Sequence, residues 1–206
     1  MIPKLTSNKE LMLQARENLR GNWIEPVLIT FAYSMIIGLI SMVMAQGYYG
    51  LSWLIDWLIG GPIAVGLASF YLAVTREKKF DVHKLNRGVQ QILKVIFTNV
   101  LVNIFITLWA LLLLIPGIIA GYSYSMVYFI LCDQPGLSIS ETLKRSTKLM
   151  YGNRWKLLCL HCRFIGWFVL SLLTLGIGFY WFWPYYMTSK TYFYEDLLRG
   201  QGEFGF

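Results

Sequence analysis

Charged residues are scarce in this chain. They make up 14% of its 206 residues, whereas hydrophobic residues make up 56% and the mean hydropathy is +0.53. A typical soluble domain is about one quarter charged. The additional apolar surface has to face something other than water, and a lipid bilayer is the usual environment. The 18 glycines and 6 prolines form no low-complexity tract, so the composition also argues against disorder.

Cysteines, histidines and enzymatic signatures are also few. Three cysteines provide no disulfide framework, and there are only two histidines. The motifs of zinc proteases, serine hydrolases and phosphate-binding loops are absent, so we expect neither enzymatic activity nor a cofactor. The first 22 residues are polar and lack a cleavage pattern, so we expect the first apolar segment to stay as an anchor.

Cys159, His161 and Cys162 resemble a metal cluster, because a Cys-x-x-Cys pair on a helix places both thiols on one face. Zinc accepts thiolate and imidazole ligands. A structural zinc site needs four ligands, however, and the other candidates are only Cys132 and His83. We therefore predict no metal and interpret the thiols as small apolar groups in a membrane helix.

Long uncharged stretches indicate membrane-spanning helices. About 20 apolar residues suffice to cross a bilayer. The uncharged stretch over residues 95–132 has 38 residues, nearly twice that length, and we expect Ile115-Pro116-Gly117 to divide it. A second tight turn is predicted at residues 175–178. The predicted spans of this single membrane domain (residues 1–206) are approximately 25–45, 54–75, 95–115, 118–134, 155–175 and 179–197.

The positions of Lys and Arg predict the orientation. All 18 lie in the N-terminal segment, in the second and fourth connections, or near the C-terminus, except Arg163, two turns into the fifth span. The three opposite connections carry none, and only Asp56 lies at an edge. Positively charged connections stay in the cytoplasm. The sequence thus predicts an all-α protein of the cytoplasmic membrane, with six transmembrane helices as three hairpins and both termini in the cytoplasm.

Short amphipathic segments precede the odd-numbered spans. Ser7 with Glu10 and Ser138 with Glu141 match the capping-box pattern at a helix start. Residues 85–92 also alternate apolar and basic faces. We expect three interfacial helices on the cytoplasmic side, with their apolar faces toward the membrane, as part of a threefold repeat of interfacial helix plus hairpin.

The basic residues suggest lipid as a partner. The net charge is +7, but no nucleic-acid-binding motif accompanies it, so we expect no nucleic acid partner. Lys144, Arg145 and Lys148 share one face of an amphipathic segment and are candidates for contacts with anionic lipid or another protein. Arg163 either anchors its span by reaching the cytoplasmic interface, with Asp133 or Glu25 as a conceivable partner, or contacts a substrate or anionic lipid.

A polar stripe on the third span has two interpretations. Asn99 and Asn103 lie one turn apart, and Tyr128 on the fourth span is polar as well. These groups could line a polar path, but such groups more often form hydrogen bonds between helices. The first interpretation predicts a small transporter or channel, and the second a protein whose bundle is packed solid there.

Several segments together resemble a bacterial integral-membrane family catalogued as domain of unknown function 975. In order, they are residues 15–23, 61–62, 66–67, 114–118, 155–157, 164–167, 173–178, 184–186 and 193–197. The chain is also distantly similar to the membrane domain of some glycerophosphodiester phosphodiesterases. The resemblance implies a multi-pass bacterial membrane protein but no known activity. We expect an accessory, scaffolding or lipid-associated role, with other membrane proteins or a second copy as partners; the alternative is a small transporter or channel.

Overall fold

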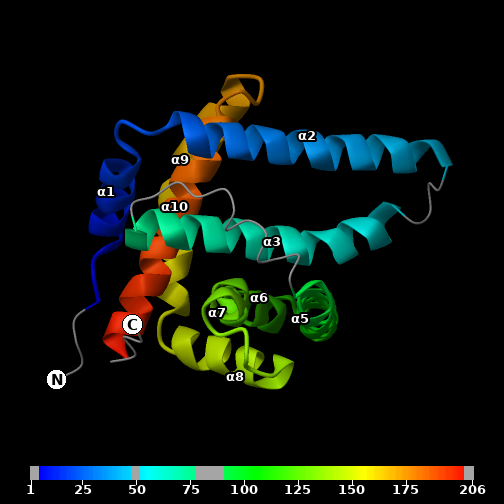
Figure 1. Cartoon of the computed structure of the whole chain (residues 1–206). Coiled ribbons are helices and arrows are strands. Elements are labelled where there is room, and N and C mark those ends of the chain that lie inside the picture. Colours follow the sequence, from blue (N-terminus) through cyan, green and yellow to red (C-terminus); the bar gives the residue numbers. More distant parts are fainter. Residues whose placement is uncertain (1–4, 48–51, 78–90, 202–206) are drawn as a thin grey trace.

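The computed structural model describes residues 5–47, 52–77 and 91–201, and within these ranges it contains helices and loops but no strand. The all-helical prediction is therefore confirmed for this part of the chain (Figure 1). The helices are α1 (Asn8–Leu19), α2 (Ile24–Gly47), α3 (Ser52–Glu77), α5 (Ile92–Leu112), α6 (Leu114–Ser123), α7 (Val127–Asp133), α8 (Ile139–Met150), α9 (Arg154–Leu173) and α10 (Phe179–Gly200).

Three segments are long and apolar enough to cross a membrane: Ile92–Leu111, Ile115–Asp133 and Arg154–Leu173. A fourth is obtained if α1 and α2, which meet at an angle of 95°, count as one bent span. The number six and the hairpin arrangement stay predictions. In Figure 1, α2 and α3 extend side by side and run across α9 and α10, so the helices do not form one parallel bundle.

The predicted break in the long apolar stretch is present. The chain leaves the helical conformation at Leu113, two residues before the expected position, and α6 then packs back onto α5. Pro116 lies in the first turn of α6, where a missing N–H costs nothing. A Cβ on Gly117 would lie 2.6 Å from Cα of Ala110, so only glycine lets the two backbones approach so closely.

The turn between α9 and α10 is also where the sequence predicts it. Leu175 and Gly176 have φ values of 54° and 89°, in the left-handed region that glycine enters without steric cost. Leu175 is 95% exposed at the tip of this turn. The connection reverses the chain, and Gly178 then packs against Ser171 of α9.

Both predicted capping boxes form, and the helices they begin bury their apolar faces in the protein. Ser7 caps α1 and Ser138 caps α8, each in exchange with the Glu three residues later. Hydrogen bonds from Ser138 lower the pKa of Glu141. The apolar faces, including Leu11 of α1 and Leu149 of α8, are fully buried against neighbouring helices. The expectation that these faces meet lipid is wrong, because protein already covers them; residues 85–90 lie outside the described residues.

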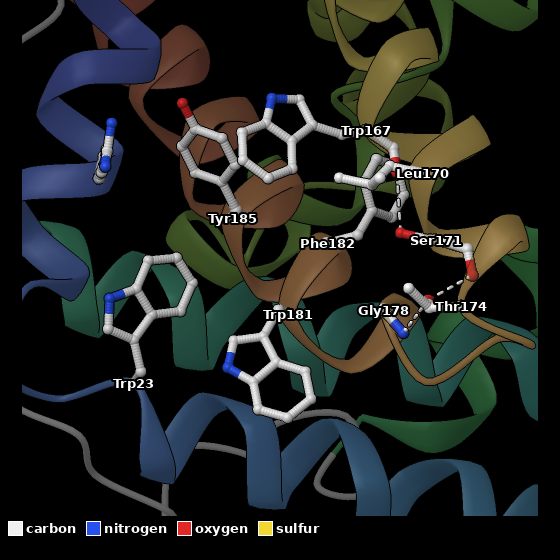
Figure 2. Close-up of a pocket in the computed structure, with 10 residues that line it drawn as sticks. Trp23, Trp167, Leu170, Ser171, Thr174, Gly178, Trp181, Phe182 and Tyr185 are labelled. Carbon is white, nitrogen blue, oxygen red and sulfur yellow. Dashed lines mark hydrogen bonds between the residues drawn. The ribbon is translucent and has the colours of Figure 1, made fainter.

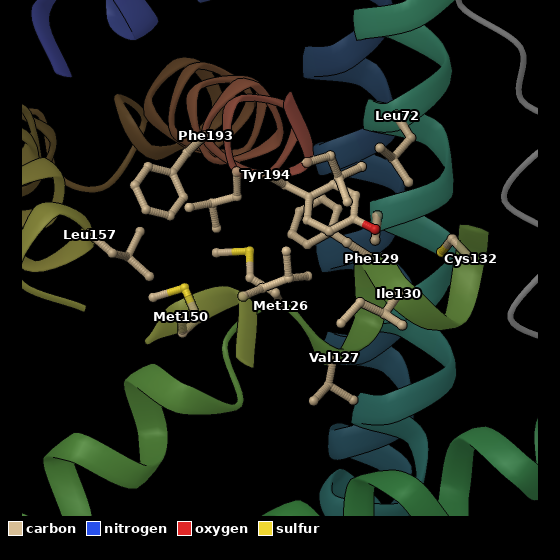
Figure 3. Packing of buried hydrophobic residues seen from close by; sticks show 14 of the residues in the cluster. Leu72, Met126, Val127, Phe129, Ile130, Cys132, Met150, Leu157, Phe193 and Tyr194 are labelled. Atoms are coloured by element: carbon tan, nitrogen blue, oxygen red, sulfur yellow. The ribbon is translucent and has the colours of Figure 1, made fainter. Parts of the chain in front are cut away.

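The buried core lies at one end of the molecule. It joins α1, α7 and α8 to the second half of α3, the first half of α5, the first turns of α9 and much of α10. Figure 3 shows Met126, Phe129, Phe193 and Tyr194 packed within it. The C-terminal half of α9 and much of α2 and α5 instead expose large apolar side chains. The packed end is the one that the sequence assigns to the cytoplasm.

Candidate functional site

An ionic cluster joins the ends of three helices. The guanidinium of Arg76, at the end of α3, donates two hydrogen bonds of 2.7 Å to the carboxylate of Asp133, at the end of α7. Its Nε donates at 2.7 Å to Oε1 of Glu195 on α10. Tyr194 donates a further hydrogen bond of 3.0 Å to Asp133. Burial alone would lower the pKa of Arg76, but the two carboxylates outweigh it and raise that pKa above its ordinary value.

A second ionic cluster fastens the N-terminal segment to the end of the chain. Asp196 of α10 accepts hydrogen bonds from the backbone N–H and the hydroxyl of Thr6, the latter at 2.6 Å. Nζ of Lys156, at the start of α9, lies 2.7 Å from the same carboxylate. Asn8 completes the contact by donating to the carbonyl of Lys156 at 2.8 Å. The first residues of α1, the start of α9 and the end of α10 therefore meet at one point.

The polar residues predicted on the third and fourth spans come together. Tyr128 of α7 donates to Oδ1 of Asn99 at 2.5 Å, and Asn103 donates to the carbonyl of Asn99 at 2.8 Å. Asn99 is buried, and a Cβ added at Gly61 of α3 would lie 2.8 Å from its Cβ. The three side chains thus bond to one another at a close approach of helices. Whether they also line a path stays a prediction.

His161 lies between two tyrosines. Its Nδ1 is 3.0 Å from the hydroxyl of Tyr122 and its Nε2 is 2.8 Å from that of Tyr186. In neutral imidazole one nitrogen donates and the other accepts, so both are occupied. Within residues 5–47, 52–77 and 91–201, no three His, Cys, Asp or Glu side chains are grouped to hold a metal ion. The imidazole therefore connects α6, α9 and α10, an arrangement that the sequence did not indicate.

The predicted basic contacts have different surroundings. Lys144 and Lys148 are exposed on α8, whereas Arg145 is half-buried and has a partner. Arg163 is exposed on α9 and makes no ion pair within the described part of the chain. Within the described residues Arg163 pairs with neither Asp133 nor Glu25, the two conceivable partners; the carboxylate of Asp133 binds Arg76 instead.

An aromatic cleft of about 430 Å³ lies between α9, α10 and the junction of α1 with α2. Figure 2 shows Tyr185 facing Trp167 at one end, with Ser171, Thr174 and Gly178 at the other. Arg16 of α1 also lines the cleft. Its apolar wall consists of Trp23, Trp167, Leu170, Trp181, Phe182 and Tyr185. Sequence periodicity could not reveal this cleft, because its walls come from opposite ends of the chain.

These features define an all-helical protein with three or four segments able to cross a membrane and a packed, ion-paired end. The chain belongs to the DUF975 family of proteins of unknown function, whose family profile matches residues 1–116 and 110–201. The sequence-based assignment to this family is thereby confirmed. No curated protein and no solved structure is significantly similar to the chain. These comparisons do not show the expected distant similarity to the membrane domain of glycerophosphodiester phosphodiesterases.

Proposed function

We propose that the chain is an integral protein of the bacterial cytoplasmic membrane, with six spans and both termini in the cytoplasm. The two ionic clusters support this topology, because they join the ends of helices that the sequence assigns to the cytoplasm. Lys94, at the start of α5, also donates to the carbonyl of Pro135 beyond α7. Groups in hydrogen-bond contact lie on the same side of a membrane.

The steep crossing of α2 and α3 over α9 and α10 is compatible with this proposal. Helices that span a membrane tilt by up to about 40° from its normal, so two pairs tilted in opposite directions can cross steeply. Backbone groups in all of these helices bond internally, as a bilayer core demands. The proposal therefore requires that the α2–α3 pair or the α9–α10 pair is strongly tilted from the membrane normal.

For the role of the protein, we favour a lipid-associated, accessory or scaffolding function without enzymatic turnover. The observation that supports this role is an extensive apolar surface together with exposed cations. Leu28, Phe31 and Met35 of α2, and Leu108, Phe168 and Leu172 of α5 and α9, are between 44% and 57% exposed. Lys144, Lys148 and Arg163 are exposed as well. An apolar surface rimmed by cations fits lipid chains and anionic headgroups.

Lipid retention tests this role. The protein is extracted from membranes in mild detergent, and the anionic and zwitterionic phospholipids that copurify are counted by mass spectrometry. We expect an excess of anionic lipid over the composition of the membrane, reduced in a Lys144→Gln/Lys148→Gln variant. A matched variant, Asn22→Gln, changes an exposed polar residue without changing charge. Equal retention of both lipid classes by the wild type would contradict a lipid-associated role.

A small transporter or channel is the second candidate, because Asn99, Asn103 and Tyr128 converge between α5 and α7. Their hydrogen bonds to one another favour helix packing over a water-filled path. Flux in proteoliposomes separates the two functions. Loss of solute flux in Asn103→Leu, with unchanged folding, would replace the lipid-associated role by transport.

A further inference from the structure

The aromatic cleft presents mostly apolar surface, and two of its hydroxyl groups, those of Ser171 and Thr174, already donate hydrogen bonds within the protein. Ser171 donates to the carbonyl of Trp167 at 2.8 Å, and Thr174 donates to that of Ser171 at 2.9 Å. The Thr174 hydroxyl also accepts from the backbone N–H of Gly178 at 3.0 Å, and Figure 2 shows these bonds running along the wall. Neither hydroxyl has a proton left to donate to a ligand. What the wall presents to a ligand is aromatic and aliphatic surface.

One end of the cleft carries positive charge. Arg16 lines it, and this arginine makes no ion pair in the ranges that the structure describes. Helix α1 approaches α10 from the C-terminal half of α10, as the 2.8 Å hydrogen bond of Asn18 to Tyr192 indicates. Arg16 therefore enters the cleft at the end marked by Tyr185, and the opposite end at Gly178 is uncharged.

Arg163 does not line the cleft itself, but helical periodicity places it beyond Trp167 on the same face of α9. It lies one turn before Trp167, on the helical face of α9 that also carries Leu170 and Thr174 into the cleft. Its neighbour Phe164 has its ring centroid 5.1 Å from that of Tyr185. Arg16 thus lines the cleft, and Arg163 follows the same face of α9 one turn before Trp167; neither arginine is in an ion pair within the described residues.

We propose that this cleft binds one anionic phospholipid, with an acyl chain along Trp167, Leu170 and Trp181 and the phosphate between Arg16 and Arg163. This inference deepens the lipid-associated role and rests on it. Charge complementarity selects the headgroup, because guanidinium groups bind phosphate well and none of the described residues neutralises these two. The cleft volume of about 430 Å³ falls within the range of ligand pockets, roughly 300–1,000 Å³. The aromatic lining selects an apolar chain.

Tryptophan fluorescence can test the proposal, since Trp23, Trp167 and Trp181 line the cleft. The whole protein in detergent is titrated with dibrominated phosphatidylglycerol, whose bromines quench tryptophan at contact, and separately with dibrominated phosphatidylcholine. We expect saturable quenching near one lipid per protein, with preference for phosphatidylglycerol. Removing either arginine, by Arg16→Gln or Arg163→Gln, should lower this preference about fivefold. Arg16→Lys and Arg163→Lys should retain most of it.

Two further variants distinguish lipid bound in the cleft from lipid bound elsewhere on the protein. Leu170→Trp fills the cleft without altering charge, and it should abolish the saturable phase for both lipids. Lys144→Gln/Lys148→Gln, on α8 and outside the cleft lining, should lower the amount of anionic lipid retained by the whole protein but leave the saturable quenching in the cleft unchanged. Unaltered binding by the arginine variants or by Leu170→Trp would overturn the cleft assignment. If only the α8 variant lost the preference for phosphatidylglycerol, the lipid-associated role would be supported but the assignment of the lipid to the cleft would be refuted. If the wild type preferred neither lipid, both proposals would be refuted.

Discussion

At the residue scale, Arg76 holds together parts of the chain that are far apart in sequence. Its partners Asp133 and Glu195 are 57 and 119 residues away, and its planar guanidinium satisfies both at once. Lysine could not do the same, since it lacks the paired donors that match a carboxylate. The cluster therefore depends on this side chain more than on either acid.

Replacing Arg76 by Met should destabilise the protein by about 1–3 kcal/mol, because two carboxylates would face each other without a counter-charge. This range is below that of a fully buried pair because the Arg76 side chain is 37% exposed. Thermal unfolding in detergent measures the effect, and Lys148→Met serves as the control for an exposed cation. Adding Asp133→Asn and Glu195→Gln to Arg76→Met should restore part of the loss. An Arg76→Met midpoint equal to that of Lys148→Met would show that the cluster contributes nothing.

Local sequence signals were sufficient to predict the structural role of some residues but not of others. Ser7 and Ser138 could be predicted as helix caps because the partner of each stands three residues away. The contact of Arg76 with Glu195 has no such signal, since neither spacing nor periodicity connects them. For Arg163, topology alone suggested Asp133 or Glu25 as conceivable partners, and Asp133 is bound by Arg76.

At the element scale, glycine positions decide how closely helices pack. Helix α6 contains Gly117, which touches the backbone of α5 at Ala110, and Gly121, around which a Cβ would find nothing within 4 Å. The two glycines lie on the same helix, one turn apart. They differ in the space around them, which makes them a matched pair.

Gly117→Ala should destabilise the protein, because its Cβ would overlap the Ala110 backbone and force α6 away from α5. An overpacked contact costs about 1–3 kcal/mol. Gly121→Ala should be neutral or stabilising by up to about 1 kcal/mol, since alanine favours a helix. Unfolding midpoints of both variants and the wild type check this contrast. Equal effects of the two substitutions would mean that α6 does not pack on α5 in this way.

The amphipathic helices mark the limit of sequence patterns at this scale. Periodicity correctly predicted that α1 and α8 have one apolar face, but it does not reveal what covers that face. In α8, Leu149 and Met150 are fully buried in the protein core, and the side left exposed carries polar residues, including Lys144 and Lys148. The sequence could not distinguish protein from lipid as the apolar partner, because both exclude water.

At the scale of the whole molecule, packing and charge gather at one end. The core, the ionic clusters and the start of α1 lie together, whereas α2, α5 and the far half of α9 expose apolar side chains. Contact between Thr6 and Asp196 puts the N-terminal segment beside the end of α10. If the described helices cross a membrane, Thr6 and Asp196 lie on the same side of it, so an even number of spans separates them.

The last prediction is the topology itself. Reporter fusions at Gln46, Gly117 and Gly178 should report the outside. Fusions after Gln134 and at the C-terminus should report the inside, as should one at Phe80, which lies outside the described residues. All basic connections would then face the cytoplasm.

Fusions can disturb a small protein, so single cysteines provide an independent measurement. In a background with Cys132, Cys159 and Cys162 changed to alanine, Leu175→Cys at the exposed turn should react with an impermeant maleimide in intact cells. Gln201→Cys, exposed just beyond α10, should react only after the cells are broken. Labelling of Gln201→Cys from outside would place the end of α10 on the outer face. Since Asp196 binds both Thr6 and Lys156, that result would move the entire ion-paired end outward and reverse the orientation that the basic residues predict.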